Sequence, residues 1–215
     1  MKHIYLVRHG QTLANTLQRH QSSDETLTSK GRLQAHHVAQ ILSLLKIDSL
    51  LCSTFKRARE TAEIISSHLH LPYVVDESLV EIRRPDFIYG QSYYSFQTIL
   101  YLFALFRKSE LPLWDYAGAE NMFALRNRIE DAKKSLISAE GERVVAVSHG
   151  VFMNLFLANV CRERKMTLIE FIKVIVTTKK IPNTGIVHLQ FDEHAPKGVC
   201  AWQLVETLEP EVEHF

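Results

Sequence analysis

The sequence predicts an α/β protein: a three-layer α/β/α sandwich with a mostly parallel central sheet, an antiparallel edge strand and a helical cap insertion. Short apolar runs alternate along the chain with stretches of helical periodicity, the element order of a parallel sheet covered by helices. The runs at 4–7 and 144–147 are continuously apolar, which is typical of central strands covered on both faces. The 215 residues, 46% of them hydrophobic and 23% charged, fit one globular domain spanning 1–215.

The expected strands are short apolar runs that end at polar residues or at glycine. They lie at 4–7, 50–53, 73–75, 144–148, 186–191 and 199–205. The last two runs alternate less cleanly than the others, so we expect them to form an antiparallel edge of the sheet.

The expected helices lie between these strands. Thr28 is the expected N-cap of a helix whose apolar residues recur at helical spacing over 33–45. The same spacing recurs over 58–69 and 122–136. The tetrapeptide Thr-Leu-Ile-Glu at 167–170 has the form of a capping box, which predicts the start of a further helix.

The segment 85–118 does not fit the alternation of strands and helices. It contains no strand pattern, is rich in tyrosine and phenylalanine, and ends near Pro112-Leu113-Trp114. We expect an inserted helical hairpin that covers one end of the sheet and caps a substrate pocket, since such insertions sit where ligands bind.

The charge balance excludes a protein that binds nucleic acid or membranes through a broad basic surface. Lys plus Arg is 25 and Asp plus Glu is 24, a net charge of +1. The longest apolar run, 99–106, is far shorter than the roughly 20 residues of a membrane helix. The N-terminus lacks the apolar core of a signal peptide, so we expect a cytoplasmic protein.

The three cysteines are scattered and odd in number. Cys52, Cys161 and Cys200 form no Cys-x-x-Cys pair. We expect reduced, buried thiols, with neither a disulfide framework nor a thiolate zinc site.

Two of the apolar strands end alike, one at Arg8-His9-Gly10 and the other at Ser148-His149-Gly150. Ligands bind at the carboxyl ends of the strands in open α/β sheets, and glycine lets the backbone approach a ligand closely. This paired setting distinguishes His9 and His149 from the rest of the 11 histidines, and it makes Gly150 a candidate for substrate contact.

A third strand end carries a basic turn. Lys56, Arg57 and Arg59 fall in the first turn of the predicted helix, where the helix dipole disfavours cations. Either an anion shares this site, or the turn is solvated and paired with Glu60 or Glu63.

These motifs together resemble the histidine phosphatase superfamily, the phosphoglycerate-mutase-like group with an Arg-His-Gly tripeptide after its first strand. The matching motifs follow one another over nearly the whole chain. They are Arg8 to Thr12 with Asn15, Leu27-Thr28-x-x-Gly31-x-x-Gln34-Ala35, Ser53 to Ala62, Leu79-x-Glu81, Ser148-His149-Gly150 and Asn183-Thr184-Gly185.

The resemblance implies a phosphoryl-transfer site with no metal and no cofactor. His9 would be the nucleophile that takes the phosphoryl group. The phosphoryl oxygens would be held by Arg8, Arg57, His149 and Asn15, which supply the positioned donors that such a transition state needs. We expect a neutral His9, since only the neutral ring can attack, and a protonated His149.

The resemblance places the proton donor for the leaving oxygen at Glu81. Glu77 and Asp86 are rival donors, and a surface salt bridge between Glu81 and Arg83 is the alternative without catalysis. The sequence departs here from many family members, which carry a glycine four residues after the donor. In this chain Arg83-Arg84-Pro85-Asp86 follows instead, and the next glycine is Gly90. A second departure is Thr54, where proline is common; we expect it to affect the entry to the helix.

Arg83 and Arg84 lie beside the expected donor. They would either bind a second acidic group of the substrate or be solvated. Ala119-Glu120-Asn121 stands where many relatives carry Gly-Glu-Ser, so the contacts to the substrate are expected to differ.

The sequence therefore predicts a phosphatase that hydrolyses a phosphate monoester through a phosphohistidine on His9. The substrate would be a small phosphorylated molecule, with a phosphoprotein as the other possibility. A phosphoglycerate-type mutase is the nearest rival, although the Glu-Arg-His-Tyr-Gly segment of those enzymes is missing, and a sugar bisphosphatase also remains open. A phosphate-binding module without turnover is the alternative from another class.

Overall fold

The computed structural model describes residues 1–108, 116–162, 164, 166–177 and 180–210. Its centre is a six-stranded sheet with the order β3-β2-β4-β1-β5-β6. The strands are β1 (Lys2–Arg8), β2 (Ser49–Cys52), β3 (Tyr73–Val75), β4 (Arg143–Ser148), β5 (Ile186–Phe191) and β6 (Trp202–Leu208). Strands β1 to β4 are parallel, whereas β5 is antiparallel to both β1 and β6. The predicted sheet, mostly parallel with an antiparallel edge, is confirmed.

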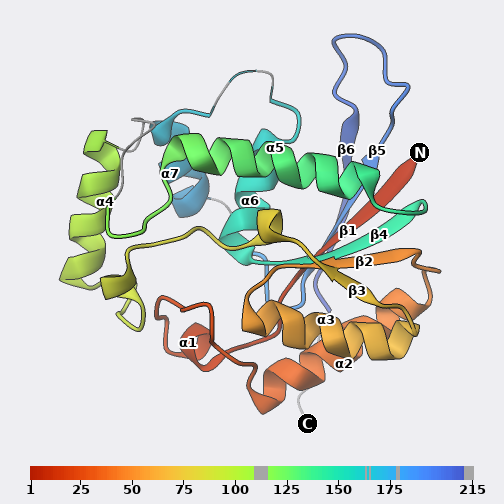
Figure 1. The fold of residues 1–215 in the computed structure, drawn as a ribbon, viewed down its shortest axis with the longest axis horizontal. Helices are drawn as coiled ribbons and strands as arrows, with labels where there is room; N and C mark the ends of the chain where they lie inside the picture. The colour runs from red at the N-terminus through yellow and green to blue at the C-terminus, as the bar shows by residue number, and fades with distance from the viewer. Residues whose placement is uncertain (109–115, 163, 165, 178–179, 211–215) are drawn as a thin grey trace.

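Helices cover both faces of this sheet (Figure 1). One face carries α2 (Ser29–Ser43) and α3 (Lys56–Leu69), and the other carries α5 (Met122–Ser138), α6 (Gly150–Asn159) and α7 (Leu168–Thr177). The shorter elements are α1 (Leu13–Thr16) and the 3-10 helices η1 (Glu77–Leu79) and η2 (Asp86–Ile88). The three-layer sandwich is therefore confirmed.

The central strand β1 shows why its sequence is apolar at every position. Ile4 and Leu6 pack into the hydrophobic core on the α5 and α6 side. Tyr5 and Val7 pack into the second core, against α2 and α3. A strand with a core on each face has no position left for a polar side chain, so it lacks alternation.

The predicted helix starts are confirmed. Thr28 is the N-cap of α2, and its side chain accepts a hydrogen bond from the Gly31 N–H at 3.0 Å. At the start of α7, the Thr167 N–H donates to Glu170 Oε2 at 2.9 Å, and the Glu170 N–H donates to Thr167 Oγ1 at 3.4 Å. These reciprocal bonds form the capping box.

Two elements differ from the expectations. Helix α6 was not predicted, because Gly150–Asn159 is apolar on all sides and shows no helical period; it is a buried helix, with Phe152 and Phe156 at most 1% exposed. Strand β6 begins at Trp202 rather than at 199, since its pairing with β5 starts where Trp202 lies opposite Phe191.

The expectation of three reduced cysteines is wrong. Cys161 and Cys200 form a disulfide, with their Cα atoms 5.2 Å apart, and only Cys52 is a free, buried thiol. The two partners are 39 residues apart in sequence and meet because the end of α6 lies beside the residues that precede β6. Burial raises the pKa of Cys52 to about 12.

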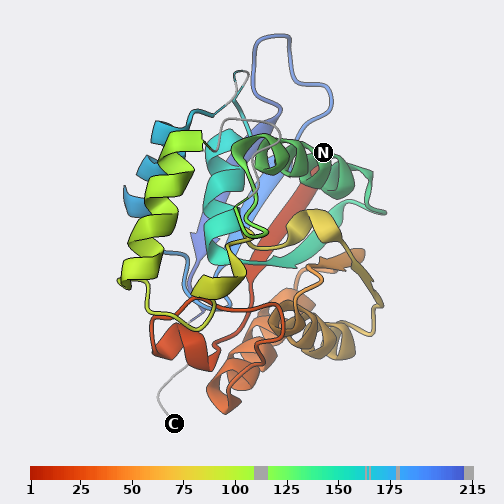
Figure 2. The same cartoon turned by 60° about the vertical axis from the view of Figure 1, so that its left-hand side comes forward.

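The described part of the segment 85–118 contains η2 and α4 (Phe96–Lys108), and residues 109–115 lie outside the described residues. Helix α4 stands at the side of the molecule, beyond the end of the sheet (Figures 1 and 2). Its role as a cap remains a prediction.

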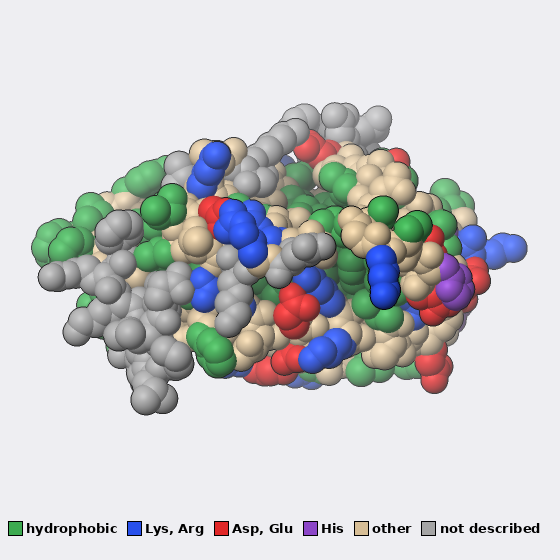
Figure 3. Space-filling view, turned by 90° about the horizontal axis from the view of Figure 1, so that it is seen from above, with side chains coloured by type: hydrophobic (Ala, Val, Ile, Leu, Met, Phe, Trp, Pro, Cys, Tyr) green, Lys and Arg blue, Asp and Glu red, His purple; other side chains and the backbone are tan. Residues whose placement is uncertain are grey.

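The surface carries charges of both signs. On the face seen in Figure 3, basic and acidic side chains are interspersed among apolar ones. Within the described residues, no helix combines the length and the hydropathy that crossing a bilayer requires.

Candidate active site

Two histidines meet at the carboxyl ends of the paired strands β1 and β4. Arg8 and Ser148 are partners in the parallel register, so His9 and His149 follow at the same edge of the sheet. The His9 N–H donates to Ser148 O at 3.0 Å, and the two ring centroids lie 5.2 Å apart. His9 is 2% exposed and His149 is 0% exposed, so both imidazoles lie in one enclosed site.

The hydrogen bonds of His9 define its tautomer. Nδ1 lies 2.7 Å from Gly10 O, and a carbonyl oxygen only accepts, so Nδ1 carries the hydrogen. Nε2 therefore holds a lone pair, to which Arg57 Nε–H donates at 3.2 Å. Burial holds the pKa of His9 well below its usual value, and the nearby Arg57 and Arg8 lower it further. The neutral ring presents Nε2 as a nucleophile.

Only one of the three cations at the start of α3 reaches this site. Arg57 is 1% exposed, donates from Nη1 to Ser22 O at 2.7 Å, and lies 5.0 Å from the centroid of the Phe55 ring. Burial lowers the pKa of Arg57 to about 10, so the guanidinium remains charged near neutral pH. Lys56 and Arg59 are exposed and line a separate groove of about 560 Å³.

The His149 ring is held by a hydrogen bond at Nε2, whereas the His9 ring is held at Nδ1. Nε2 lies 2.7 Å from Ser53 Oγ, and the buried Nδ1 has no partner among the described residues. Burial lowers the pKa of His149 well below its usual value, with Arg57 as the next cause. In the absence of a bound anion, burial and the neighbouring guanidinium therefore favour the neutral His149 ring, and its protonation beside a phosphoryl group stays a prediction.

Arg8 lies against the start of α6. Its Nη1 donates to Ile181 O at 2.6 Å, and a Cβ at Gly150 would lie 3.1 Å from Arg8 Nε, so the predicted glycine lets the guanidinium pack closely. Burial lowers the pKa of Arg8. Arg8 Nε is buried without a partner among the described residues, like His149 Nδ1. Since buried polar atoms are almost always paired, both nitrogens are suited to bind oxygens of an anion.

Glu81 caps helix α6, at the edge of the same site. Its Oε1 accepts the N–H groups of Phe152 (2.9 Å) and Ile82 (3.0 Å), and its Oε2 accepts that of Val151 (3.2 Å) and no other among the described residues. The carboxylate is close enough to Arg8 to raise the pKa of that guanidinium against the effect of burial. Oε2 therefore keeps more unused acceptor capacity than Oε1.

The rival carboxyl groups lie elsewhere. Glu77 forms an ion pair with Arg83, and its side chain is 64% exposed. Asp86 is exposed in the first turn of η2. The pairing of Arg83 with Glu77 also differs from the predicted alternative, in which Arg83 would pair with Glu81.

Asn15 is built into the loop beside His9. Its Oδ1 accepts the N–H of Thr12 at 3.2 Å and Asn183 Nδ2 at 3.1 Å, so only its amide nitrogen remains for a ligand. Asn183 Nδ2 also lies 3.0 Å from His9 O, within donating distance. The Asn-Thr-Gly motif therefore braces the backbone of the catalytic candidate.

The Thr-x-x-Gly-x-x-Gln motif supports the same loop from α2. A Cβ at Gly10 would lie 2.4 Å from Gly31 O, and one at Gly31 would lie 2.1 Å from Gln11 O. The Gln11 N–H donates to Gln34 Oε1 at 2.9 Å. These positions need glycine because the two backbones are in direct contact.

The structure separates the two neighbouring arginines. Arg83 is exposed and paired with Glu77, whereas Arg84 is half-buried and donates its backbone N–H to Tyr89 Oη at 3.2 Å. The Arg84 charge acts on groups around the site. Burial lowers the pKa of His20 to about 4, with Arg84 as the second cause, and Arg84 also lowers the pKa of Arg57.

The family follows from comparison with known proteins. Residues 4–201 match the family model of the histidine phosphatase superfamily (branch 1). This chain belongs to the histidine phosphatase superfamily. The match includes both strand-end histidines and Arg57, Glu81 and Asn183.

Curated relatives of this superfamily member are named as mutases. A protein of Proteus mirabilis named probable phosphoglycerate mutase GpmB is 32% identical over 165 residues, which cover 74% of this chain and 75% of that protein. Its namesake from Erwinia tasmaniensis is 43% identical over 83 residues, 38% of this chain. That match spans only 39% of the length of the Erwinia protein.

Solved structures share the fold. YhfR of Bacillus stearothermophilus is 25% identical, with a TM-score of 0.76 and coverage of 99% of this chain and 98% of that one. The mycobacterial glucosyl-3-phosphoglycerate phosphatase Rv2419c, in complex with VO3, is 21% identical, with a TM-score of 0.73 and coverage of 95% and 98%.

A buried ion pair of this superfamily member was not expected from the sequence. Glu120 accepts two hydrogen bonds from Arg128, at 2.7 and 2.6 Å, and Arg128 also donates to Ser78 O and Val80 O. Arg128 thus holds the backbone that leads to Glu81. Glu120 therefore has a structural role. Arg128 lies in the interior of α5, and nothing in the sequence distinguishes this buried arginine from a surface one.

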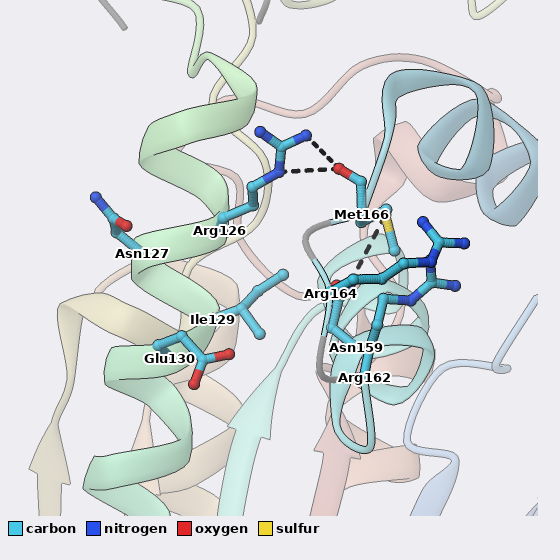
Figure 4. A pocket seen from close by; sticks show the side chains of 8 residues that line it. All are labelled: Arg126, Asn127, Ile129, Glu130, Asn159, Arg162, Arg164 and Met166. Atoms are coloured by element: carbon cyan, nitrogen blue, oxygen red, sulfur yellow. Dashed lines mark hydrogen bonds between the residues drawn. The ribbon is translucent and has the colours of Figure 1, made fainter.

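A cavity of about 140 Å³ lies at the other end of α6 from His149 (Figure 4). It is lined by Arg126, Asn127, Ile129, Glu130, Asn159, Arg162, Arg164 and Met166. Arg126 Nε donates to Met166 O at 2.9 Å, and Arg162 and Arg164 both pair with Glu170. These contacts hold the loop before α7 against α5, so the cavity belongs to the helix packing.

Proposed function

We propose that this protein is a metal-independent phosphatase that hydrolyses a phosphate monoester through a phosphohistidine on His9. One observation carries the proposal: His9 Nε2 holds a lone pair, and three groups that can bind phosphoryl oxygens belong to residues close to the His9 ring. Those groups are Arg57, Arg8 Nε and His149 Nδ1, the last two being buried and without partners among the described residues. Two fixed guanidinium groups supply the charge stabilisation that phosphoryl transfer requires.

The reaction follows from this arrangement in two displacements. His9 Nε2 attacks phosphorus as the bond to the ester oxygen breaks, and the leaving oxygen takes the proton of the Glu81 carboxyl group. The Glu81 carboxylate then accepts a proton from water as that water attacks the phosphohistidine, which releases inorganic phosphate and the free His9 ring. Arg57 Nε, which donates to His9 Nε2, transfers its hydrogen bond to a phosphoryl oxygen when the substrate binds.

The proposal is tested with para-nitrophenyl phosphate in the presence of EDTA. If the rate of hydrolysis is the same with and without EDTA, the result supports a mechanism that needs no metal ion. Turnover that EDTA abolishes and a divalent cation restores would overturn the metal-independent mechanism, and binding of phosphate without any turnover would indicate a binding module.

A mutase is the second candidate, favoured by the name of the Proteus mirabilis relative. The two reactions are distinguished by incubation with 3-phosphoglycerate. A phosphatase releases inorganic phosphate, whereas a mutase returns the 2-phospho isomer.

The proton-donor role of Glu81 predicts a dependence on the leaving group. Glu81→Gln should slow the phosphorylation of His9 by glycerol 3-phosphate roughly 100-fold or more, because a poor leaving group needs the proton. The nitrophenol burst from para-nitrophenyl phosphate should stay within a few-fold of the native rate, since this leaving group needs none. Glu77→Gln is the matched control. If Glu81→Gln slowed both substrates equally in this step, the donor would be another residue.

Arg84 is the residue that we propose to bind a second acidic group of the substrate. It is half-buried on the side of Arg57 and His20, and no carboxylate of the described residues pairs with it. Asn15, through its amide nitrogen, and the backbone at Gly150 complete the proposed contacts to the substrate. Arg83, which the sequence made an equal candidate, is occupied by Glu77.

The two arginines can be compared directly. Arg84→Ala should lower kcat/KM for 3-phosphoglycerate about 10- to 100-fold, the scale of one hydrogen bond to a charged group. Glycerol 3-phosphate lacks the carboxylate, so Arg84→Ala should change kcat/KM for this substrate by less than about threefold. Arg83→Ala should alter the ratio between these two substrates far less. Equal ratios in both variants would contradict a carboxylate contact at Arg84.

A further inference from the structure

Ser53 lies against the ring of His149, just beyond the end of β2. The Ser53 N–H donates to Val147 O at 2.9 Å, which continues the pairing of β2 with β4 up to the active site. Ser53 Oγ lies 2.7 Å from His149 Nε2, and both residues are 0% exposed. The same oxygen accepts the Phe55 N–H at 3.3 Å. The hydroxyl therefore has defined partners on two sides.

The hydrogen of this hydroxyl has one acceptor. A serine hydroxyl carries one hydrogen and two lone pairs. Among the described residues, the partners of Ser53 Oγ are Phe55 N–H, which is a donor, and His149 Nε2. If His149 Nε2 carried a hydrogen, it would use the second lone pair, and the buried Ser53 O–H would be left without an acceptor.

We infer that the Ser53 hydroxyl donates to His149 Nε2 and holds this ring as the Nδ1–H tautomer, so that His149 presents an N–H to the phosphoryl group. His149 Nδ1 is buried and has no partner among the described residues, as expected for an N–H directed at an incoming oxygen. The consequence for catalysis rests on the proposed function, whereas the tautomer itself does not.

The two histidines then have the same tautomer but face the site in opposite ways. His9 donates its Nδ1–H to Gly10 O and turns the Nε2 lone pair to the site. His149 turns its Nε2 lone pair to Ser53 and its Nδ1–H to the site. Two rings with centroids 5.2 Å apart thus supply one nucleophile and one donor without a difference in charge.

Ser53 is accordingly a positioning residue, which acts through His149. Without its hydroxyl, His149 can move its hydrogen to Nε2 and turn a lone pair toward the phosphoryl oxygens, which repels them.

The tautomer is measured directly by long-range ¹H–¹⁵N correlation on ¹⁵N-histidine-labelled native protein, with His149 assigned from the spectrum of His149→Asn. Nitrogen shifts distinguish a protonated from an unprotonated ring nitrogen. We expect protonated Nδ1 and unprotonated Nε2 for His149 at neutral pH, and a shift of Nδ1 on addition of inorganic phosphate. A protonated Nε2 in the native protein would overturn the inference, whether or not the variants fold.

Ser53→Ala tests the consequence, with Ser148→Ala as the matched control. Ser148 is also 0% exposed, and its Oγ donates to Leu79 O at 2.7 Å. Ser53→Ala should bring an Nε2–H population into the spectrum and lower kcat roughly 10- to 100-fold, the scale for removing the partner that orients a functional histidine. Ser148→Ala should leave the tautomer unchanged.

Ser53→Thr keeps the hydroxyl. The folded Ser53→Thr protein should therefore show the same Nδ1–H tautomer of His149 as the native protein. Loss of activity in Ser53→Ala with an unchanged His149 spectrum would overturn the positioning role. An Nδ1–H tautomer in a protein that binds phosphate but turns over no ester would leave the tautomer in place and refute the proposed function instead.

Discussion

Replacing His9 with alanine is expected to abolish turnover, lowering kcat by roughly 10⁴-fold or more, because the variant has no nucleophile to receive the phosphoryl group. Phosphate binding should persist. Arg8, Arg57 and His149 remain, and the lost hydrogen bond of the His9 ring corresponds to less than about a tenfold change in affinity. Steady-state assays with para-nitrophenyl phosphate and calorimetric titration with inorganic phosphate measure the two effects.

A surface histidine gives the control for this experiment. His36 is exposed, and its Nδ1 lies 3.0 Å from His68 Nε2, between α2 and α3. His36→Ala should leave both turnover and phosphate binding unchanged. Turnover that survives in His9→Ala at a substantial fraction of the native rate would contradict covalent catalysis by this ring.

Replacing Arg57 with alanine is expected to lower kcat/KM about 10²- to 10³-fold, the scale for deleting one donor to a transition state. The guanidinium is buried beside His9 Nε2, where water cannot replace its charge. Arg57→Lys should recover little, because an ammonium lacks the planar fork that contacts His9 and Ser22 together.

Arg59 lies two residues further along the same helix and provides the matched control. It is exposed in the neighbouring groove with Lys56, and Arg59→Ala should change the rate by less than about twofold, as is usual for an exposed charge. Similar losses in Arg57→Ala and Arg59→Ala would mean that the general basic character of this turn matters, and not a contact to the phosphoryl group.

The sheet and the meeting of its two histidines could be predicted because each rests on a local pattern. Continuously apolar runs marked β1 and β4 as central strands, and both end in a histidine followed by glycine. Parallel neighbours bring their carboxyl ends to one edge, so His9 and His149 needed no further information to be placed together.

What could not be predicted depends on burial and on contacts between distant segments. Three cations at the start of α3 are equivalent in sequence, and only the packing shows that Arg57 points inward. Arg83 and Arg84 are adjacent, yet one is exposed and pairs with Glu77, whereas the other is half-buried and close enough to Arg57 to lower its pKa. Uniformly apolar α6 has no period to detect.

The disulfide and the neutral state of His149 without a bound anion were missed for similar reasons. Cys161 and Cys200 are brought together by the tertiary fold, and their separation of 39 residues matches no motif. A protonated His149 was expected from the chemistry alone, whereas its burial and the neighbouring Arg57 favour the neutral ring in the absence of a bound anion. Its hydrogen, rather than its charge, is what the site provides.

In the proposed mechanism, the phosphoryl group of the substrate is transferred to His9. Rapid-quench mixing of the protein with ³²P-labelled substrate, followed by alkaline digestion and mass spectrometry, measures this transfer directly. We expect an acid-labile, alkali-stable phosphoryl group on His9 that forms at least as fast as turnover and is absent from His9→Ala. Turnover without a phosphoenzyme on that time scale, or a phosphoryl group on another residue, would contradict it.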